Sequence, residues 1–407
     1  MSSGSSLFNT SVMGMSAQTD WLAAISKNIA NSNTAGYKNA RTDFLTVLNG
    51  YDSVGGGVTT VTRNEVSLQG SPLTTGTTTD LAISGNGFFL VSNDAGQTFL
   101  TRAGNFVPDA QGRLVNSAGY YLMGYDSKLG MSGPLSTIKV DMNKMYSSPT
   151  TQGIFGANLP SNSSVVPAAN LPSTNTIGAQ FAGKSSLTVY DNLGNAVVFD
   201  LYFAKTGANT WEMTAYNHAD AASGGSFPYA SAALTTQTLN FSTTDGSLTS
   251  PSSVTLNVPG GGAMSLNLAK MTQLGGGYTP TDNDADGYAA STIDGIHVGK
   301  TGTLSYQLAN GQTISAYEIP LGKVASPDNL TSETGNVFSA NAESGQLFIG
   351  AAGSSGYGTI QGSSLEGSTV DLASQLSSMI VAQRSFTANS QVFQVASDIM
   401  QVLTNLK

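Results

Sequence analysis

The C-terminal stretch of the chain, residues 368–407, has apolar side chains at helical spacing and contains neither proline nor glycine. Its first stripe repeats at intervals of four and three residues, which is the a/d signature of a helix that packs on another helix. A second stripe then takes over on a neighbouring face, so this helix needs several neighbours rather than one. The first stripe consists of Leu372, Leu376, Met379, Gln383, Phe386, Ser390 and Phe393, and the second of Val392, Val395, Ile399, Val402 and Leu406.

The first residues of the chain provide a matching helix. Phe8, Met15, Leu22 and Ile29 recur every seven residues, and Ile25 lies beside them. We therefore expect residues 1–36 and 368–407 to form one coiled-coil domain of terminal helices. An ordinary intramolecular coiled coil is the alternative, but helices that are apolar on more than one face and nearly free of charge favour self-assembly.

Both expected helices have plausible ends. Gly36 suits the C′ position of the first helix, and Ser368-Thr369-Val370-Asp371 has the pattern of a capping box that starts the second helix. Their outer positions are largely Ser, Thr, Asn and Gln, which are less favourable in a helix than Ala by about half a kcal/mol each. We infer that the ends are disordered in a free monomer and become ordered when many copies pack together.

Between the helices, short β-type runs alternate with Gly, Asn and Asp turns, which predicts a mainly β fold with two nested all-β domains. The strongest hairpin candidate is 185–203, with its turn at 191–195, followed by a strand at 211–216. The expected ranges are an extended connector at 37–70, a discontinuous inner β domain at 71–150 and 288–349, an inserted outer β domain at 151–287, and a Gly/Ser-rich linker at 350–367.

Composition excludes several classes of function. Charged residues make up 10% of the chain, the net charge is −9 and no Lys/Arg cluster occurs, so a nucleic-acid partner is not expected. No apolar run approaches the length of a membrane span, so we expect no membrane insertion. The N-terminus lacks the basic and apolar regions of a secretory signal, so export would need another machine.

No feature of the sequence favours catalysis or a bound cofactor. The chain has no cysteine, which excludes thiolate chemistry, and its two histidines, His218 and His297, have no carboxylate partner nearby in sequence. No nucleophile elbow, phosphate-binding loop, zinc-protease pattern or dinucleotide fingerprint is present. We therefore expect a protein that is not an enzyme and needs no cofactor.

One weak metal candidate is the run that starts at Asp282. Asp282, Asp284 and Asp286, followed by Gly287, match the first half of a calcium-binding loop. The twelfth position of such a loop is a bidentate Glu, whereas here it is Ile293. An acidic, solvated turn is therefore the favoured interpretation over a calcium site.

Several motifs resemble those of the axial proteins of the bacterial flagellum, the rod and hook subunits. The first motif runs from Asn28 to Lys38, and others lie at 80–89, 101–106 and 388–393, so the resemblance covers both ends and the inner β domain. The motif residues to which the family resemblance draws attention are Asn28, Asn31, Thr34, Gly36, Tyr37 and Lys38.

The central insertion at 151–287 favours the hook type of subunit, because rod subunits of this family are generally shorter. The resemblance implies a homopolymer that forms a curved, flexible tube, transmits torque and lets exported subunits pass. It also implies a place in the extracellular hook after export without a cleaved signal peptide, with the distal rod, the hook cap, the hook–filament junction proteins and the flagellar export apparatus as partners. A distal rod subunit and a secreted β-rich adhesin or binding protein remain the alternatives.

Overall fold

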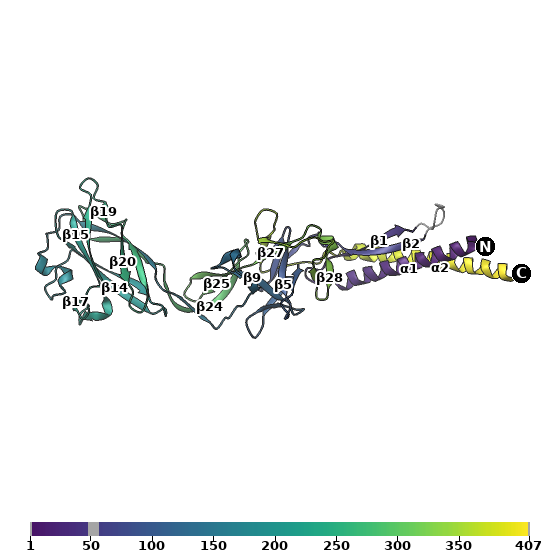
Figure 1. Cartoon of the computed structure of the whole chain (residues 1–407), viewed down its shortest axis with the longest axis horizontal. Helices are drawn as coiled ribbons and strands as arrows, with labels where there is room; N and C mark the ends of the chain where they lie inside the picture. Colours follow the sequence, from purple (N-terminus) through teal and green to yellow (C-terminus); the bar gives the residue numbers. More distant parts are fainter. Residues whose placement is uncertain (1, 48–56, 406–407) are drawn as a thin grey trace. The chain divides into compact units, whose positions relative to one another are not determined.

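The computed structural model describes residues 2–47 and 57–405, and the chain in it divides into two units (Figure 1). The first unit takes the described residues of 1–142, together with 295–307 and 313–407. The second unit takes 143–294 and 308–312, a range close to the outer domain expected at 151–287. Two terminal helices and many short strands confirm the predicted fold class.

In the first unit, α1 (Ser2–Ala30) and α2 (Leu372–Asn405) lie side by side and antiparallel (Figure 1). The Phe8 and Phe393 rings are 4.5 Å apart near the chain ends, and Asn28 Nδ2 donates to Gln375 Oε1 at 3.1 Å near the opposite end of the pair. The two ends of the sequence therefore pair along most of their length, as predicted.

A hairpin of β1 (Ala40–Thr46) and β2 (Val58–Asn64) packs along α1. The Trp21 and Phe44 rings meet edge to face at 5.6 Å, and Thr60 Oγ1 donates to Asp20 Oδ2 at 2.6 Å. Part of the stretch expected as an extended connector at 37–70 is therefore a strand pair supported by the first helix.

The β part of the first unit surrounds an apolar core that includes Phe88, Leu90, Leu100, Val324 and Phe338. Its main sheet has the order β25-β26-β9-β5-β6-β29-β28, and β27 pairs with both β5 and β30. The strands are β3 (Pro72–Thr74), β4 (Leu81–Ser84), β5 (Phe88–Ser92), β6 (Thr98–Thr101), β7 (Phe106–Pro108), β8 (Leu114–Asn116), β9 (Tyr121–Asp126), β10 (Ser136–Thr137), β25 (Thr303–Leu308), β26 (Thr313–Glu318), β27 (Pro320–Lys323), β28 (Thr331–Glu333), β29 (Val337–Ser339), β30 (Phe348–Ala351), β31 (Thr359–Gly362) and β32 (Ser364–Glu366). β24 (Tyr288–Val298) is shared by the two units.

The second unit is a sandwich of two five-stranded sheets. One is the antiparallel series β13-β14-β15-β18-β19, and the other has the order β20-β21-β12-β22 with β23 also paired to β12. Phe155 and Phe203 stack between the sheets at 5.4 Å, and Trp211 is completely buried. The strands of this unit are β11 (Met145–Ser148), β12 (Gln152–Pro160), β13 (Gly183–Tyr190), β14 (Ala196–Lys205), β15 (Thr210–Asn217), β16 (Ala221–Ala222), β17 (Ser226–Tyr229), β18 (Thr235–Phe241), β19 (Leu248–Ser250), β20 (Ser253–Asn257), β21 (Ala263–Asn267), β22 (Thr272–Leu274) and β23 (Thr279–Ala285).

The predicted hairpin at 185–203 and the strand that follows it are confirmed as β13, β14 and β15. The predicted helix ends are wrong. The first helix ends at Ala30 rather than at Gly36, and the second begins at Leu372, where Asp371 Oδ1 accepts from the Ala373 N–H at 3.0 Å as an N-cap.

The segment 350–367 is not the flexible linker that its composition predicts. β30 pairs with β27, β31 with β4 and β32 with β3. Neighbouring strands that are distant in sequence offer hydrogen-bond partners to this Gly/Ser-rich backbone, and tertiary pairing overrides its low β propensity.

Candidate assembly site

The apolar side chains of α2 remain largely uncovered in the single chain. Ten large ones have between 38% and 58% of their surface exposed. They lie on more than one side of the helix, as the two sequence stripes predict. They are Leu372, Leu376, Ile380, Val381, Phe386, Val392, Val395, Ile399, Met400 and Val402, and we call them the open face of α2.

The predicted assembly residues fall into three groups. On α1, Phe8, Met15, Leu22 and Ile29 are half-buried and Ile25 is buried. On α2, Met379 and Phe393 are half-buried, and Leu406 lies outside the described residues. The others, which belong to the open face, are Leu372, Leu376, Phe386, Ile399 and Val402.

The contact between the helices uses small and amide side chains that the hydrophobic pattern did not reveal. Ala382 and Ala396 are the most buried residues of α2, at 0% and 3% exposure. Between them in sequence, Asn389 lies so close to Gly14 that a Cβ on this glycine would come within 2.8 Å of Asn389 Nδ2. Because small residues let the helices approach closely, the large apolar side chains of α2 are left on its outer surface.

Where α1 ends, Asn28 joins the helix to the start of β1. Its side-chain amide donates to the Ala40 carbonyl and accepts from the Ala40 N–H, both at 2.8 Å, in the manner of a strand pair. The Tyr37 hydroxyl donates to the same Asn28 oxygen at 3.2 Å, and burial raises the pKa of Tyr37. These bonds fix the turn that leads out of the first helix.

Within that turn, Thr34 Oγ1 donates to Asn31 Oδ1 at 3.1 Å, and Asn31 Nδ2 donates to the Lys27 carbonyl at 2.9 Å. Gly36 has φ +66°, and its N–H donates to the Glu366 carbonyl at 2.7 Å. A Cβ here would lie 2.6 Å from the Ala103 nitrogen. Glycine is therefore required by both conformation and space.

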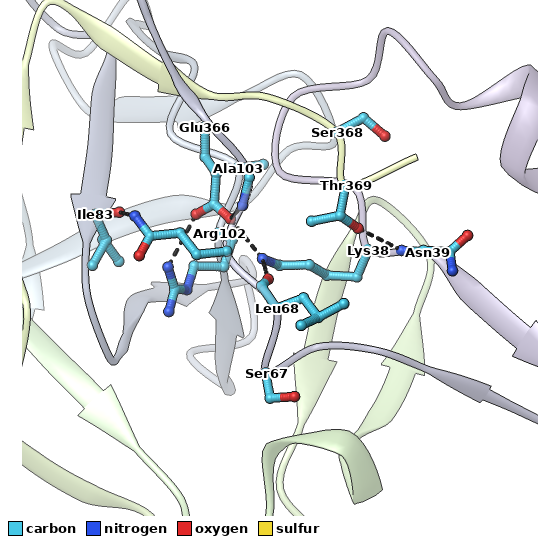
Figure 2. Close-up of polar contacts among 12 residues, drawn as sticks. Lys38, Asn39, Ser67, Leu68, Ile83, Arg102, Ala103, Glu366, Ser368 and Thr369 are labelled. Carbon is cyan, nitrogen blue, oxygen red and sulfur yellow. Dashed lines mark hydrogen bonds and ion pairs between the residues drawn. The ribbon is translucent and has the colours of Figure 1, made fainter. Parts of the chain in front are cut away.

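Lys38, the last residue of the motif, enters a buried ion cluster (Figure 2). Lys38 Nζ lies 2.5 Å from Glu366 Oε1, and Arg102 Nη1 lies 3.0 Å from Glu366 Oε2. The three side chains are between 1% and 4% exposed. Lys38 also donates to the Leu68 carbonyl, and the Gly70 N–H donates to Glu366 Oε1 at 2.9 Å.

The cluster holds two buried cations around one carboxylate. Burial lowers the pKa of the Lys38 ammonium, and the nearby Glu366 only partly offsets this effect. Arg102 has further support from the Gly85 carbonyl at 2.9 Å and from the Phe88 ring, whose centroid is 5.2 Å from its guanidinium carbon. Loss of Glu366 would leave both cations buried without a counterion.

The ion cluster was only partly visible in the sequence. Lys38 and Arg102 belong to stretches that the family resemblance singles out, whereas Glu366 lies in the segment expected to be a linker. No local pattern marks Glu366, because its partners are 328 and 264 residues away.

The three aspartates of the calcium candidate have separate contacts. Asp282 pairs with Lys270 at 2.9 Å, and Asp286 accepts from the Thr151 N–H and hydroxyl at 2.8 and 2.6 Å. Asp284 Oδ1 accepts from the Ala285 N–H. In residues 2–47 and 57–405 no group of three or more His, Cys, Asp or Glu side chains is arranged to hold a metal ion.

Comparison with family models gives four matches along the chain. Residues 8–38 match the flagella basal body rod protein model, and residues 82–157 match the flagellar hook protein FlgE/F/G D1 domain. Residues 158–288 match the flagellar basal body protein FlaE D2 domain, and residues 361–406 match the C-terminal model of the flagellar basal body rod FlgEFG proteins. These matches define a flagellar axial protein with rod-type ends.

The relatives extend over nearly the whole chain. The flagellar hook protein FlgE of Brucella suis is 40% identical over 412 residues, covering 98% of each chain. That of Escherichia coli is 31% identical and covers 98% of this chain and 100% of its own. The chain belongs to the flagellar hook protein family.

A solved structure supports the fold. The crystal structure of the Helicobacter pylori flagellar hook protein FlgE2 matches with a TM-score of 0.53 at 13% identity, covering 71% of this chain and 99% of that one. None of the helices in the described part of the chain is both long and apolar enough to cross a membrane.

Proposed function

We propose that the chain is a structural, non-enzymatic subunit of the flagellar hook, and that the open face of α2 packs against other copies to build the polymer. The observation that carries this proposal is the exposure of ten large apolar side chains on one terminal helix. Covering half-exposed side chains of this size contributes about 1 kcal/mol each, or about 10 kcal/mol for the whole face.

A single association costs about 4–15 kcal/mol in lost freedom of motion, so one neighbour covering part of this face gives little net stability. Several neighbours that cover it together give a stable assembly. Contacts between different surfaces of identical subunits generate a helical array when the rotation between neighbours does not close into a ring. The result is a tube in which the terminal helices form the inner layer.

The outer β unit gives this tube its flexibility in our proposal. Units joined by a few chain crossings can shift against neighbouring copies while the helical layer holds. The polymer would then bend while it transmits torque, and it would let exported subunits pass through its centre. Its proposed location is the extracellular part of the flagellum, after export without a cleaved signal peptide.

The proposed partners, besides further copies of the chain, are flagellar components. Sequence resemblance supports the distal rod, the hook cap, the hook–filament junction proteins and the export apparatus in this role. The family matches at both ends of the chain support a shared mode of packing between rod-type and hook-type helices.

The direct test is Phe386→Asp on the open face, with Ile177→Asp as the matched control. Ile177 is 87% exposed in the second unit, so the same change there adds a charge without touching the helices. We expect Phe386→Asp to abolish tube formation in sedimentation and negative-stain microscopy, and Ile177→Asp to assemble. Normal tubes from Phe386→Asp would show that Phe386 does not take part in the packing between copies.

A further inference from the structure

In the second unit, a strap of residues 218–231 lies over the sheet surface that faces away from the sandwich core. The strap contains a 3-10 turn (His218–Asp220) and the two short strands β16 and β17, which pair with each other as a separate two-stranded sheet. Tyr229 of the strap stacks on Tyr216 of the sheet, with ring centroids 4.3 Å apart, and Phe227 lies 4.6 Å from Tyr202. Because so short a hairpin is not stable alone, the strap depends on these contacts.

One carboxylate holds the strap to the sheet. Asp200, on β14, is completely buried, and its Oδ2 accepts from the Tyr229 hydroxyl at 2.6 Å and lies 2.7 Å from His218 Nδ1. Its other oxygen accepts from Ser186 Oγ at 2.7 Å. His218 therefore does have a carboxylate partner, one that is distant along the chain.

Lys184 completes the attachment from the neighbouring strand β13. Its Nζ lies 3.1 Å from Asp200 Oδ2 and donates to the Gly225 carbonyl of the strap at 2.8 Å. Asp200 thus contacts β17 and the 3-10 turn of the strap directly, and Lys184 links it to Gly225 between the two short strands.

The other polar groups around this centre are tyrosines and two carboxylates with partners of their own. The Tyr202 and Tyr229 hydroxyls lie 2.8 Å apart. Asp220 accepts from Ser231 at 2.5 Å within the strap, and Glu212 accepts from Ser173 Oγ at 2.9 Å. Asp200 is therefore the acidic group in contact with both the sheet and the strap.

Burial raises the pKa of the Asp200 carboxyl, but the hydrogen bonds from Tyr229, His218, Ser186 and Lys184 together outweigh it and hold this pKa below its ordinary value of 3.8. The stabilisation is fully present above pH 3.8 and is lost as the pH falls through the lower, folded value. The core of the sandwich is built from apolar side chains, so protonation of Asp200 acts on the strap and not on the packing between the two sheets.

We propose that the strap is an acid-released cover, with the Asp200 carboxylate as its latch and the tyrosine cluster as the surface that it uncovers. Once Asp200 is protonated, it loses its ion pair with Lys184 and can no longer accept every hydrogen bond that converges on it. The strap then opens while the two sheets stay together. The released form exposes the aromatic surface of the sheet formed by Tyr202 and Tyr216, and it exposes Phe227 and Tyr229 on the strap.

Hydrogen exchange measured by mass spectrometry on the full chain tests this proposal, with rates corrected for the intrinsic effect of pH. Strap peptides are compared with a peptide from β20 and β21, which belongs to the opposite sheet. At pH 7 we expect the strap of Asp200→Asn to exchange at least about tenfold faster than in the wild type, with the β20–β21 peptide unchanged. In the wild type, the protection of the strap from hydrogen exchange should fall only below pH 3.8.

His218→Gln is the second variant, because it removes one strap contact and leaves the carboxylate. It should keep most strap protection at pH 7. Two results would overturn the proposal. One is a wild-type strap whose protection from hydrogen exchange stays constant down to pH 3. The other is a wild-type strap that loses this protection between pH 6 and 7, together with a His218→Gln variant that lacks it. If Asp200→Asn unfolds both sheets, the pH series of the wild type is the test. In that series the strap must lose its protection from hydrogen exchange at a higher pH than the β20–β21 peptide.

Discussion

Lys38 and Glu366 are 328 residues apart in the sequence, yet their Nζ and Oε1 atoms lie 2.5 Å apart in a site that excludes solvent. Lys38 follows the end of α1, and Glu366 precedes the start of α2. The ion pair therefore fixes the points at which both terminal helices leave the β part of the first unit.

We predict that Glu366→Gln destabilises the first unit by about 3–5 kcal/mol, because two cations stay buried without a counterion. Hydrogen exchange should increase around residues 68–70 and 102, while the second unit is unchanged. Glu343→Gln is the matched control, since Glu343 is an exposed carboxylate of the same unit. Equal stability of the two variants would show that the ion cluster contributes nothing.

Gly36→Ala should destabilise the first unit by at least about 2 kcal/mol, because the new Cβ would meet backbone atoms at a positive φ. Gly76→Ala provides the comparison, since a Cβ there meets nothing within 4 Å. Denaturant unfolding of both variants measures the difference. A neutral Gly36→Ala would mean that the turn after α1 relaxes freely.

In the second unit, burial raises the pKa of Tyr216 from 10.0 to about 12. The unfolded chain releases this proton at lower pH than the folded unit, so the stability is fully present below pH 10 and declines as the pH rises toward 12. Two pKa units correspond to about 2.7 kcal/mol.

Tyr216→Phe should therefore reduce the alkaline loss of stability, at the cost of the hydrogen bond to the Pro172 carbonyl at 2.8 Å. Trp211 fluorescence in a Trp21→Phe background reports unfolding of this unit, because the chain has two tryptophans, one in each unit. An unchanged slope of stability against pH would show that another group controls alkaline unfolding.

Removal of residues 150–286 tests the role of the outer β unit. Ser148 and Tyr288 are paired in neighbouring strands, so a short glycine turn can close the gap. We expect the shortened chain to form tubes without stable curvature, as judged by electron microscopy. Tubes with the wild-type curvature would place the origin of bending in the remaining part of the subunit.

Much of the fold could be predicted from local patterns. Helical spacing indicated both terminal helices, and strong β runs around the turn at 191–195 indicated the hairpin that is now β13 and β14. The strands β31 and β32 could not be predicted, because their partners β4 and β3 lie far away in sequence and their composition is that of a linker.

The candidate assembly site also has a part that could be predicted from the sequence and a part that could not. The open face of α2 was visible because large apolar residues repeat along it. The contact with α1 was only partly visible: Phe8 and Phe393 belong to the predicted stripes, whereas Ala382, Asn389 and Ala396 leave no hydrophobic stripe. Asn28 and Lys38 were singled out by the resemblance, but their bonds to Ala40 and Glu366 required the three-dimensional structure.

The most direct test of the account is circular dichroism with negative-stain microscopy on the purified full chain, before and after concentrated salt induces association. We expect the monomer to show β signal with little helix, and helix to appear together with curved tubes as the open face is covered. A monomer that already has full helical signal and never polymerises would contradict the account, because the pair of α1 and α2 would then be stable without further copies of the chain.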